Sequence, residues 1–276
     1  MTTDWTERTL TAQGVELFAL ERGGEAGRAP IVLLHGAGGN ALTWTTIAPA
    51  LADRRVLLLD MPGHGRSPKL PGWDLLETAD AIARAIQAYL GNTRPIWGGH
   101  SWGGKVAGII AAQHPSHCSG LVLVDPSPSA AVPVDIEEFV NGIWAAEMQS
   151  HASPEAAAET GQAQRHWQPW DDETALAFRH GIAERTDGGW SLRPTREDLV
   201  ALATATLHVD AGELLANAAF VPTLLLVAEE SHPWQGITNM IVYSGATQAV
   251  IPGHHWIHQC NRSAVMAAVS GWLPGR

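Results

Sequence analysis

The segment at residues 95–104, Pro-Ile-Trp-Gly-Gly-His-Ser-Trp-Gly-Gly, constrains the fold of this chain more than any other. Residues 94–97 read as the end of a buried strand, and the apolar side chains of residues 106–110 fall at helical spacing directly afterwards. Residues 99–103 lie between these two elements and fit the pattern G-x-S-x-G. The segment therefore predicts a strand, a sharp turn and a helix, with Ser101 exposed on the turn.

The chemistry of a serine hydroxyl explains this arrangement. The hydroxyl is a weak nucleophile unless it stands on a strained turn beside a base, and glycines two residues before and after it let the backbone approach closely. The N-terminus of the following helix also favours negative charge that develops at the site. An ordinary tight turn with an uninvolved serine is the alternative, but the strand–turn–helix setting favours Ser101 as a nucleophile.

Apolar runs alternate with amphipathic segments along most of the chain. Runs typical of strands buried on both faces occur at residues 31–34, 55–60, 120–125 and 221–228. Helices are predicted at residues 42–52, 74–90, 237–243 and 262–272, a starting hairpin at 9–20 and a last strand at 247–251. This alternation predicts an α/β fold with a mostly parallel sheet flanked by helices, whose ligands bind beyond the carboxyl ends of the strands.

The pattern changes between about residues 133 and 217, where it becomes helical, polar-faced and interrupted. Because this stretch lies between two core strands, we expect it to form a helical cap or lid above the crevice at the strand ends. The predicted organisation is a core domain in two parts, residues 1–132 and 218–276, with a cap at residues 133–217.

Charge, hydropathy and cysteine content disfavour nucleic-acid binding, membrane insertion and a disulfide-rich fold. The net charge of −11 disfavours nucleic acid and anionic membrane surfaces as partners. The N-terminus lacks the features of a signal peptide, and no apolar stretch is long enough to span a bilayer, so we expect a cytoplasmic protein. Cys118 and Cys260 are too few for a disulfide scaffold and lack metal-ligand spacing, so no metal site is expected.

Four motifs, in this order, resemble the α/β-hydrolase fold family. They are His35-Gly36 after a buried strand, residues 60–67 (Asp-Met-Pro-Gly-His-Gly-Arg-Ser), the elbow at residues 99–103, and the late pair His255-Trp256. The resemblance covers nearly the whole chain and implies an α/β-hydrolase fold with a serine nucleophile, a catalytic triad, an oxyanion hole and a cap. Members keep the order nucleophile, acid, histidine, and the resemblance implies no metal or organic cofactor.

The base that activates Ser101 is predicted to be a histidine, because its pKa lies near neutrality. His255 stands in the loop after the last predicted strand, where the family keeps its histidine. Its neighbour His254 is the alternative. His35, His64 and His100 are expected to orient loops through hydrogen bonds.

The triad acid is where this chain departs from the family pattern. Many members carry glycine, two variable residues and aspartate after the seventh strand, but residues 228–231 here are Ala-Glu-Glu-Ser. Some members take the acid from the end of strand six instead, where Asp125 stands. We expect Asp125 to be the acid, with Glu230 or Glu229 as alternatives, or no acid at all.

An oxyanion hole needs two N–H donors aimed at the developing alkoxide. The resemblance implies that one is the backbone amide of Trp102, directly after the nucleophile. The other would be the amide of Ala37, which follows His35-Gly36. The alternative is that His35-Gly36 only turns the chain.

Tryptophans of the cap segment, with Trp102, are candidates for lining an apolar pocket. They are Trp102, Trp144, Trp167 and Trp170. Packing of the cap onto the core is the alternative role for each. No cluster of Arg or Lys indicates an acidic substrate, so we expect a small-molecule substrate, mainly apolar or aromatic, that is cleaved as a carboxylic ester or lactone. The sequence leaves the oligomeric state open.

Other functions are compatible with these motifs. A C–C bond hydrolase or a cofactor-free haloperoxidase-like enzyme would use the same triad, and a thioesterase or acyltransferase is a further possibility. A non-catalytic ligand-binding receptor with this fold is the alternative from another class. It stays possible because Ser231 stands where the family pattern has an aspartate. Turnover of activated esters that depends on Ser101 separates enzyme from receptor.

Residues 36–41 also fit a dinucleotide-binding pattern, G-x-G-x-x-[G/A], and Asp60 lies at the end of the next strand. That alternative is disfavoured, because it leaves the elbow and the late Gly-His-His-Trp at residues 253–256 without a role.

Overall fold

The computed structural model describes residues 4–127, 135–209, 221–231 and 246–273. The predicted boundaries of the cap near residues 133 and 217, and the helix predicted at 237–243, lie outside these ranges. The strands are β1 Thr6–Ala12, β2 Val15–Arg22, β3 Ile31–Leu34, β4 Val56–Leu59, β5 Ile96–His100, β6 Gly120–Val124, β7 Ile182–Glu184, β8 Trp190–Leu192, β9 Thr223–Ala228 and β10 Thr247–Ile251. The α-helices are α1 Leu75–Leu90, α2 Ser101–Gln113, α3 Ile136–Trp144, α4 Pro154–Gln162, α5 Asp172–Gly181, α6 Arg196–His208, α9 Ile257–Cys260 and α10 Arg262–Trp272. Three 3₁₀ segments are η1 Ala41–Leu51, η2 Pro115–His117 and η3 Arg165–Trp167.

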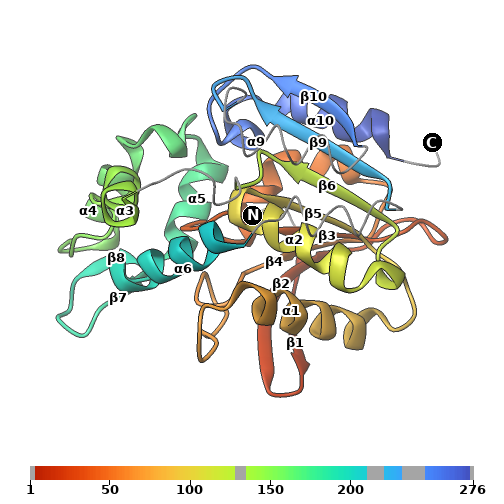
Figure 1. Cartoon of the computed structure of the whole chain (residues 1–276). Coiled ribbons are helices and arrows are strands. Elements are labelled where there is room, and N and C mark those ends of the chain that lie inside the picture. Colours follow the sequence, from red (N-terminus) through yellow and green to blue (C-terminus); the bar gives the residue numbers. More distant parts are fainter. Residues whose placement is uncertain (1–3, 128–134, 210–220, 232–245, 274–276) are drawn as a thin grey trace.

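Eight strands form one sheet in the order β1-β2-β4-β3-β5-β6-β9-β10 (Figure 1). The pairs β1–β2 and β2–β4 are antiparallel, and all other neighbours are parallel. Strands β3, β4, β6 and β9 are buried at every residue, as the continuous apolar runs predict for strands covered on both faces. The predicted mostly parallel α/β sheet is therefore confirmed.

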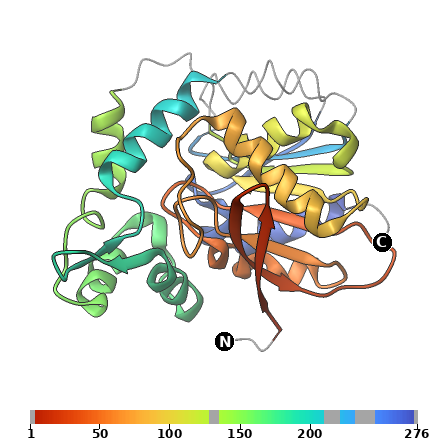
Figure 2. The same ribbon diagram turned by 90° about the horizontal axis from the view of Figure 1, so that it is seen from below.

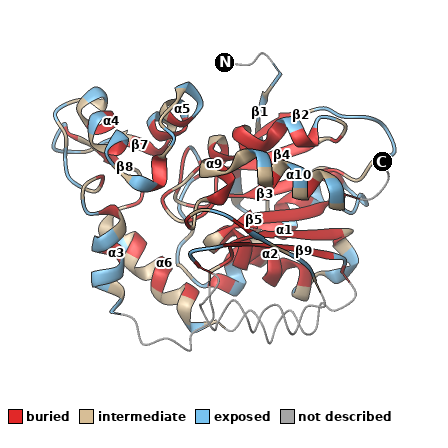
Figure 3. Ribbon diagram, turned by 90° about the horizontal axis from the view of Figure 1, so that it is seen from above, coloured by how far each residue is buried: buried red, intermediate tan, exposed pale blue. Residues whose placement is uncertain are grey.

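Helices cover both faces of this sheet, because alternate strand residues point to opposite sides. Val32 and Leu34 of β3 join a core cluster with α1 and α2, whereas Ile31 and Leu33 join a second cluster with η1 and α10. Figure 2 shows α1 and α2 together on one side of the strands, and Figure 3 shows the buried residues concentrated in the sheet.

The helix predicted at residues 42–52 is a 3₁₀ segment, η1, rather than an α-helix. Pro49 inside it has no N–H to donate, which disfavours a regular α-helix. Hydroxyls of Thr43, Thr45 and Thr46 donate to the carbonyl oxygens three residues earlier, so side chains compete with the backbone ladder. Local side-chain chemistry outweighs the apolar periodicity here.

Residues 135–209, called the insert below, form a separate lobe beside the sheet (Figures 1 and 3). Helices α3 to α6 pack around an apolar cluster of their own, which includes Trp144, Trp167 and Phe178. The sequence pattern did not predict the short antiparallel hairpin β7–β8 that also belongs to the insert. No helix within the described ranges is long and apolar enough to cross a bilayer.

Candidate active site

Ser101 stands at the junction of β5 and α2 with a backbone φ of +51°, which is unusual for a residue with a side chain. The neighbouring backbone is too close to tolerate side chains. A Cβ on Gly99 would lie 2.3 Å from the carbonyl oxygen of Gly103, and one on Gly103 would lie 2.4 Å from that of His35. Both glycines are therefore required by the turn that holds Ser101 out from the sheet.

His255 connects Ser101 to Asp125 by hydrogen bonds. The Ser101 hydroxyl lies 2.8 Å from Nε2 of His255, and Nδ1 of His255 lies 2.5 Å from Oδ2 of Asp125. Asp125 directly follows β6, is fully buried and has a φ of +41°. The structure thus brings together three residues that lie far apart in the sequence, in an order that can pass a proton from the hydroxyl to the imidazole.

Two further donors hold the Asp125 carboxylate. The backbone N–H of Ala228 donates to Oδ1 at 2.8 Å, and the Ser231 hydroxyl donates to Oδ2 at 2.7 Å. Sequence reasoning treated Ser231 only as a vacated acid position and missed this bond. No local pattern marks this bond, because it depends on the end of β9 pairing with the end of β6 in the parallel sheet.

The alternative residues lie elsewhere. Glu230 is exposed and its carboxylate binds Arg165 at 2.6 Å. Glu229 is exposed as well. The ring of His254 accepts a hydrogen bond from the backbone N–H of Trp256 at 3.3 Å. Burial lowers the pKa of His254 below its ordinary value.

Two buried histidines hold the loop that contains Ala37. His35 donates from Nδ1 to the carbonyl oxygen of Gly36 at 2.7 Å and accepts from the N–H of Met61 at 2.9 Å. His64 accepts from the N–H of Gly38 at 3.1 Å. Burial lowers the pKa of His35 to about 3 and that of His64 to about 4, so both rings are neutral and can accept these bonds.

The amides of Ala37 and Trp102 have no hydrogen-bond acceptor among the residues that the structure describes. Ala37 lines a cavity beside the site, and Trp102 is the first residue after Ser101. Two free N–H groups beside a serine are what an oxyanion hole requires. Both residues are therefore available for the role that the sequence resemblance implies.

A cavity lies between the sheet and the insert, and His100, the residue directly before Ser101, lines it. The space in it that a water-sized group can occupy is about 20 Å³, enough for one small polar or methyl-sized group. Trp144 and Trp167 from the insert line it, together with Trp256 from the loop that holds His255. Its other walls come from residues 36–39, Thr43, His100, His166, His258 and Gln259.

The other two predicted pocket tryptophans do not line this cavity. The Trp102 side chain is buried in the core, where its indole packs against His64 and Trp73. Trp170 packs on Phe178 within the insert. Trp256, His166 and Gln259 were missed as lining residues, although Trp256 directly follows the predicted histidine.

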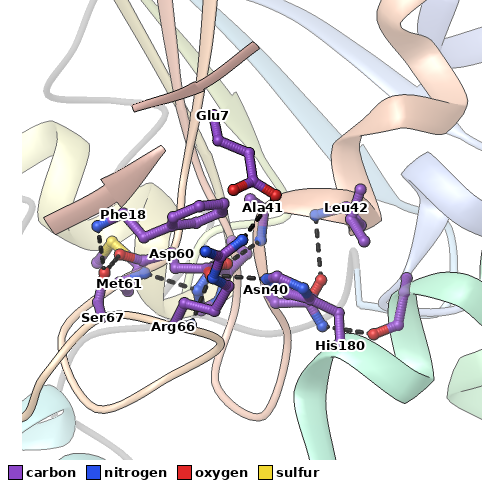
Figure 4. A network of polar contacts seen from close by, with 12 residues as sticks. Glu7, Phe18, Asn40, Ala41, Leu42, Asp60, Met61, Arg66, Ser67 and His180 are labelled. Carbon is purple, nitrogen blue, oxygen red and sulfur yellow. Dashed lines mark hydrogen bonds and ion pairs between the residues drawn. The ribbon is translucent and has the colours of Figure 1, made fainter. Parts of the chain in front are cut away.

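Asp60 serves the structure rather than a dinucleotide. Its buried carboxylate accepts hydrogen bonds from the N–H of Ala41 and Arg66 and from Nε2 of His180, each at 2.7 Å (Figure 4). Protein donors thus occupy the Asp60 carboxylate, and a 3₁₀ segment, η1, follows the glycine-rich loop where a dinucleotide site needs a regular helix. Both observations count against a dinucleotide-binding site.

Within the described ranges, no group of three or more His, Cys, Asp or Glu side chains is arranged to bind a metal ion. Cys118 and Cys260 are free thiols, and burial raises the pKa of Cys118 to about 12.

Comparison with known proteins identifies the fold and several relatives. A family model described as the alpha/beta hydrolase fold matches residues 29–233, which is more than half of the chain. The pimeloyl-[acyl-carrier protein] methyl ester esterase of Edwardsiella ictaluri (strain 93-146) is 43% identical over 105 residues, 37% of this chain and 38% of that protein. The dihydrolipoyllysine-residue acetyltransferase component of the acetoin cleaving system of Pseudomonas putida is 42% identical over 106 residues, 38% of this chain and 28% of that protein. These matches span well under half the length of either relative.

Solved structures resemble the chain over nearly its whole length. The crystal structure of E-2-(acetamidomethylene)succinate hydrolase matches with a TM-score of 0.83 and 18% identity, covering 98% of this chain and 100% of that one. The thioesterase domain from the curacin biosynthetic pathway matches with a TM-score of 0.74 and 20% identity, covering 98% and 99%. At these identities the likeness is one of fold alone.

Proposed function

The chain belongs to the alpha/beta hydrolase fold family, and on that premise we propose that it is a serine hydrolase of small carboxylic esters or lactones. The observation that carries the proposal is the continuous hydrogen-bond path from Asp125 through His255 to Ser101. The name of the Edwardsiella ictaluri relative, a methyl ester esterase, supports an ester as substrate.

In the first half of the reaction, Oγ of Ser101 attacks the carbonyl carbon while Nε2 of His255 takes the hydroxyl proton. The carbonyl oxygen becomes an oxyanion, which the amides of Ala37 and Trp102 stabilise. When the carbonyl re-forms, the C–O bond to the alcohol breaks and the alkoxide takes the proton from His255. The product of this half is an alcohol and an acyl-Ser101 ester.

In the second half, water replaces the alcohol. His255 takes a proton from the water, whose oxygen attacks the acyl carbon, and the same two amides stabilise the second oxyanion. Collapse breaks the bond to Oγ of Ser101, which recovers its proton from His255, and a carboxylic acid leaves. Asp125 keeps the His255 ring in position and stabilises its charged form in both halves.

We also propose that the insert acts as the cap of this site. Trp144, His166 and Trp167 line the same cavity as the loop of Ala37, so a substrate bound there would touch both parts. The Arg165–Glu230 ion pair also joins the insert to the core beside the site. Aromatic walls suit the expected apolar or aromatic substrate.

A ligand-binding receptor is disfavoured by the same geometry. The receptor was considered because position 231 carries a serine in place of an aspartate. Asp125, from the end of another strand, supplies the buried carboxylate to His255 instead. A C–C bond hydrolase would use the same three residues, and substrate screening separates it from an esterase.

The test is covalent labelling with a serine-directed fluorophosphonate, read by intact mass. We expect one adduct on the native protein and none on Ser101→Ala. Ser127 offers a matched control, because its hydroxyl lies 3.3 Å from that of Ser101. Ser127→Ala should keep the adduct. An adduct that survives in Ser101→Ala, or a folded native protein that hydrolyses no methyl ester and takes no label, would overturn the proposal.

A further inference from the structure

The cavity beside Ser101 has one wall that does not suit an apolar substrate. His258 and Gln259 lie on α9, which follows the His255 loop, and both line the cavity. They are 1% and 3% exposed. Nδ1 of His258 and Oε1 of Gln259 are buried without a hydrogen-bond partner in the described part of the chain.

Such atoms are costly to leave unpaired. Buried polar side-chain atoms in folded proteins nearly always have a partner, and an unsatisfied one loses its hydration without compensation. Two of them on adjacent residues of one cavity wall therefore indicate that a further group completes their hydrogen bonds. Gln259 Oε1 accepts, so that group must carry an O–H or N–H donor.

The lining side chains of the cavity indicate that the group bound there is uncharged. Among the lining residues that the structure describes, none is a Lys, Arg, Asp or Glu. Burial lowers the pKa of His258 to about 3 and that of His100 well below its ordinary value, so both rings are neutral. His166 lies 2.7 Å from the buried carboxylate of Glu147, so any charge on its ring is balanced behind the wall. An ionised ligand group would lose its hydration with no counterion in the cavity wall.

We propose that this cavity is a polar subsite of the substrate pocket, in which Gln259 and His258 hydrogen-bond an uncharged hydroxyl or amide group of the substrate. The inference rests on the proposed function and narrows its substrate class. The substrate is an ester whose small polar substituent, near the scissile carbonyl, lies between the aromatic walls of Trp144, Trp167 and Trp256.

The position of the cavity ties the substituent to the reacting carbonyl. Ala37, whose amide is assigned to the oxyanion, lines the cavity, and His100 precedes the nucleophile. His100 also donates from Nε2 to the carbonyl oxygen of His255 at 2.9 Å, which fixes the wall to the catalytic loop. A group attached close to the ester carbon therefore enters the subsite when the carbonyl oxygen reaches the amides.

The first experiment compares isosteric esters on the native enzyme in a pH-stat assay. Methyl 3-hydroxybutanoate is paired with methyl 3-methylbutanoate for the acyl side, and 2-hydroxyethyl butanoate with propyl butanoate for the alcohol side. Monomethyl succinate is the charged member. We expect kcat/KM for one of the two hydroxylated esters to be about tenfold higher than that for its apolar partner, which is the effect of one well-made hydrogen bond. The charged ester should have the lowest kcat/KM of the acyl series.

The second experiment assigns the preference to Gln259. Gln259→Met keeps the length of the side chain but removes its amide, and Gln248→Met makes the same change on exposed β10. We expect the hydroxyl-to-apolar ratio of kcat/KM to fall to about one in Gln259→Met and to stay unchanged in Gln248→Met. Using a ratio makes the result independent of how much folded enzyme each variant yields.

The outcomes separate this inference from the proposed function. Ser101-dependent hydrolysis with equal kcat/KM within both ester pairs would overturn the polar subsite while leaving the esterase intact, and would mean that water alone occupies the cavity. A hydroxyl preference that persists in Gln259→Met would overturn the assignment to this wall. Hydrolysis of no ester at all would count against the proposed function itself.

Discussion

The Ser231 hydroxyl donates a hydrogen bond to Oδ2 of Asp125 at 2.7 Å, and the same oxygen accepts from Nδ1 of His255. The residue at the position where many family members carry the acid thus supports an acid supplied by another strand. Asp125 is fully buried, so each donor to its carboxylate replaces lost hydration. A serine at position 231 is therefore compatible with the proposed triad.

Ser231→Ala should destabilise the protein while leaving part of the activity. Loss of one donor to a buried carboxylate costs about 1.5–3 kcal/mol of unfolding free energy, because Asp125 then keeps two of its three partners among the described residues, Ala228 and His255. Urea unfolding measures this change, and ester hydrolysis should fall by about tenfold or less. Ser119→Ala is the matched control, since the buried Ser119 hydroxyl has no partner among the described residues. Equal stability of the two variants would contradict the role of Ser231.

Asp125→Asn should reduce kcat by roughly 10³–10⁴-fold, because an amide neither stabilises the charged His255 ring nor enforces its tautomer. Glu230→Gln should stay within about twofold of the native rate, since the exposed Glu230 carboxylate binds Arg165 at the surface. Initial rates with one methyl ester measure both. A large loss in Glu230→Gln together with a small loss in Asp125→Asn would reverse the assignment of the acid.

Much of the fold and part of the site could be predicted, because their signals are local. The elbow at residues 99–103 is specified by the close backbone approach that only glycine allows on either side of Ser101. The hairpin β1–β2 follows from two apolar runs around a tight turn. The buried parallel strands follow from their continuous apolar composition.

Other features depend on contacts between distant residues and leave little local pattern. Ser231 meets Asp125 across 106 positions, and His166 meets Glu147 in the interior of the insert. The position of Trp102 after Ser101 predicts a backbone donor, but its indole packs against His64 and Trp73, which lie far away in the sequence. Gln259 could not be predicted to line the cavity, because this depends on the position of α9 in the folded chain.

Stability at acid pH should depend on Asp60. Burial alone would raise the pKa of this carboxyl, but hydrogen bonds and charge from His180, with the N–H of Ala41, lower that pKa below its ordinary value. A carboxyl whose pKa is lower in the folded state contributes stability that is complete above the unfolded value, and that is lost as pH falls through the folded value. We therefore expect this contribution to persist near neutrality and to disappear below about pH 4.

Urea unfolding of the native protein and of Asp60→Asn between pH 3 and pH 7 checks this expectation. Asp60→Asn should lower the unfolding free energy near neutrality and reduce its steepness below about pH 4. Glu16→Gln, which removes an exposed carboxylate on β2, should leave the curve close to that of the native protein. Curves for native protein and Asp60→Asn that run parallel down to pH 3 would contradict the linkage.

Two glycines, Gly99 in β5 and Gly271 in α10, should respond in opposite ways to replacement by alanine, because only Gly99 is closely surrounded by backbone atoms. A Cβ on Gly99 would lie 2.3 Å from the Gly103 carbonyl oxygen, whereas one on Gly271 in α10 meets nothing within 4 Å. Gly99→Ala should therefore cost more than about 4 kcal/mol or prevent folding, since backbone atoms cannot yield as a flexible side chain can. Gly271→Ala should be neutral or stabilise by up to about 1 kcal/mol, because alanine favours a helix over glycine. Thermal unfolding of both variants measures the contrast, and a Gly99→Ala protein as stable and active as the native one would contradict the strained turn that presents Ser101.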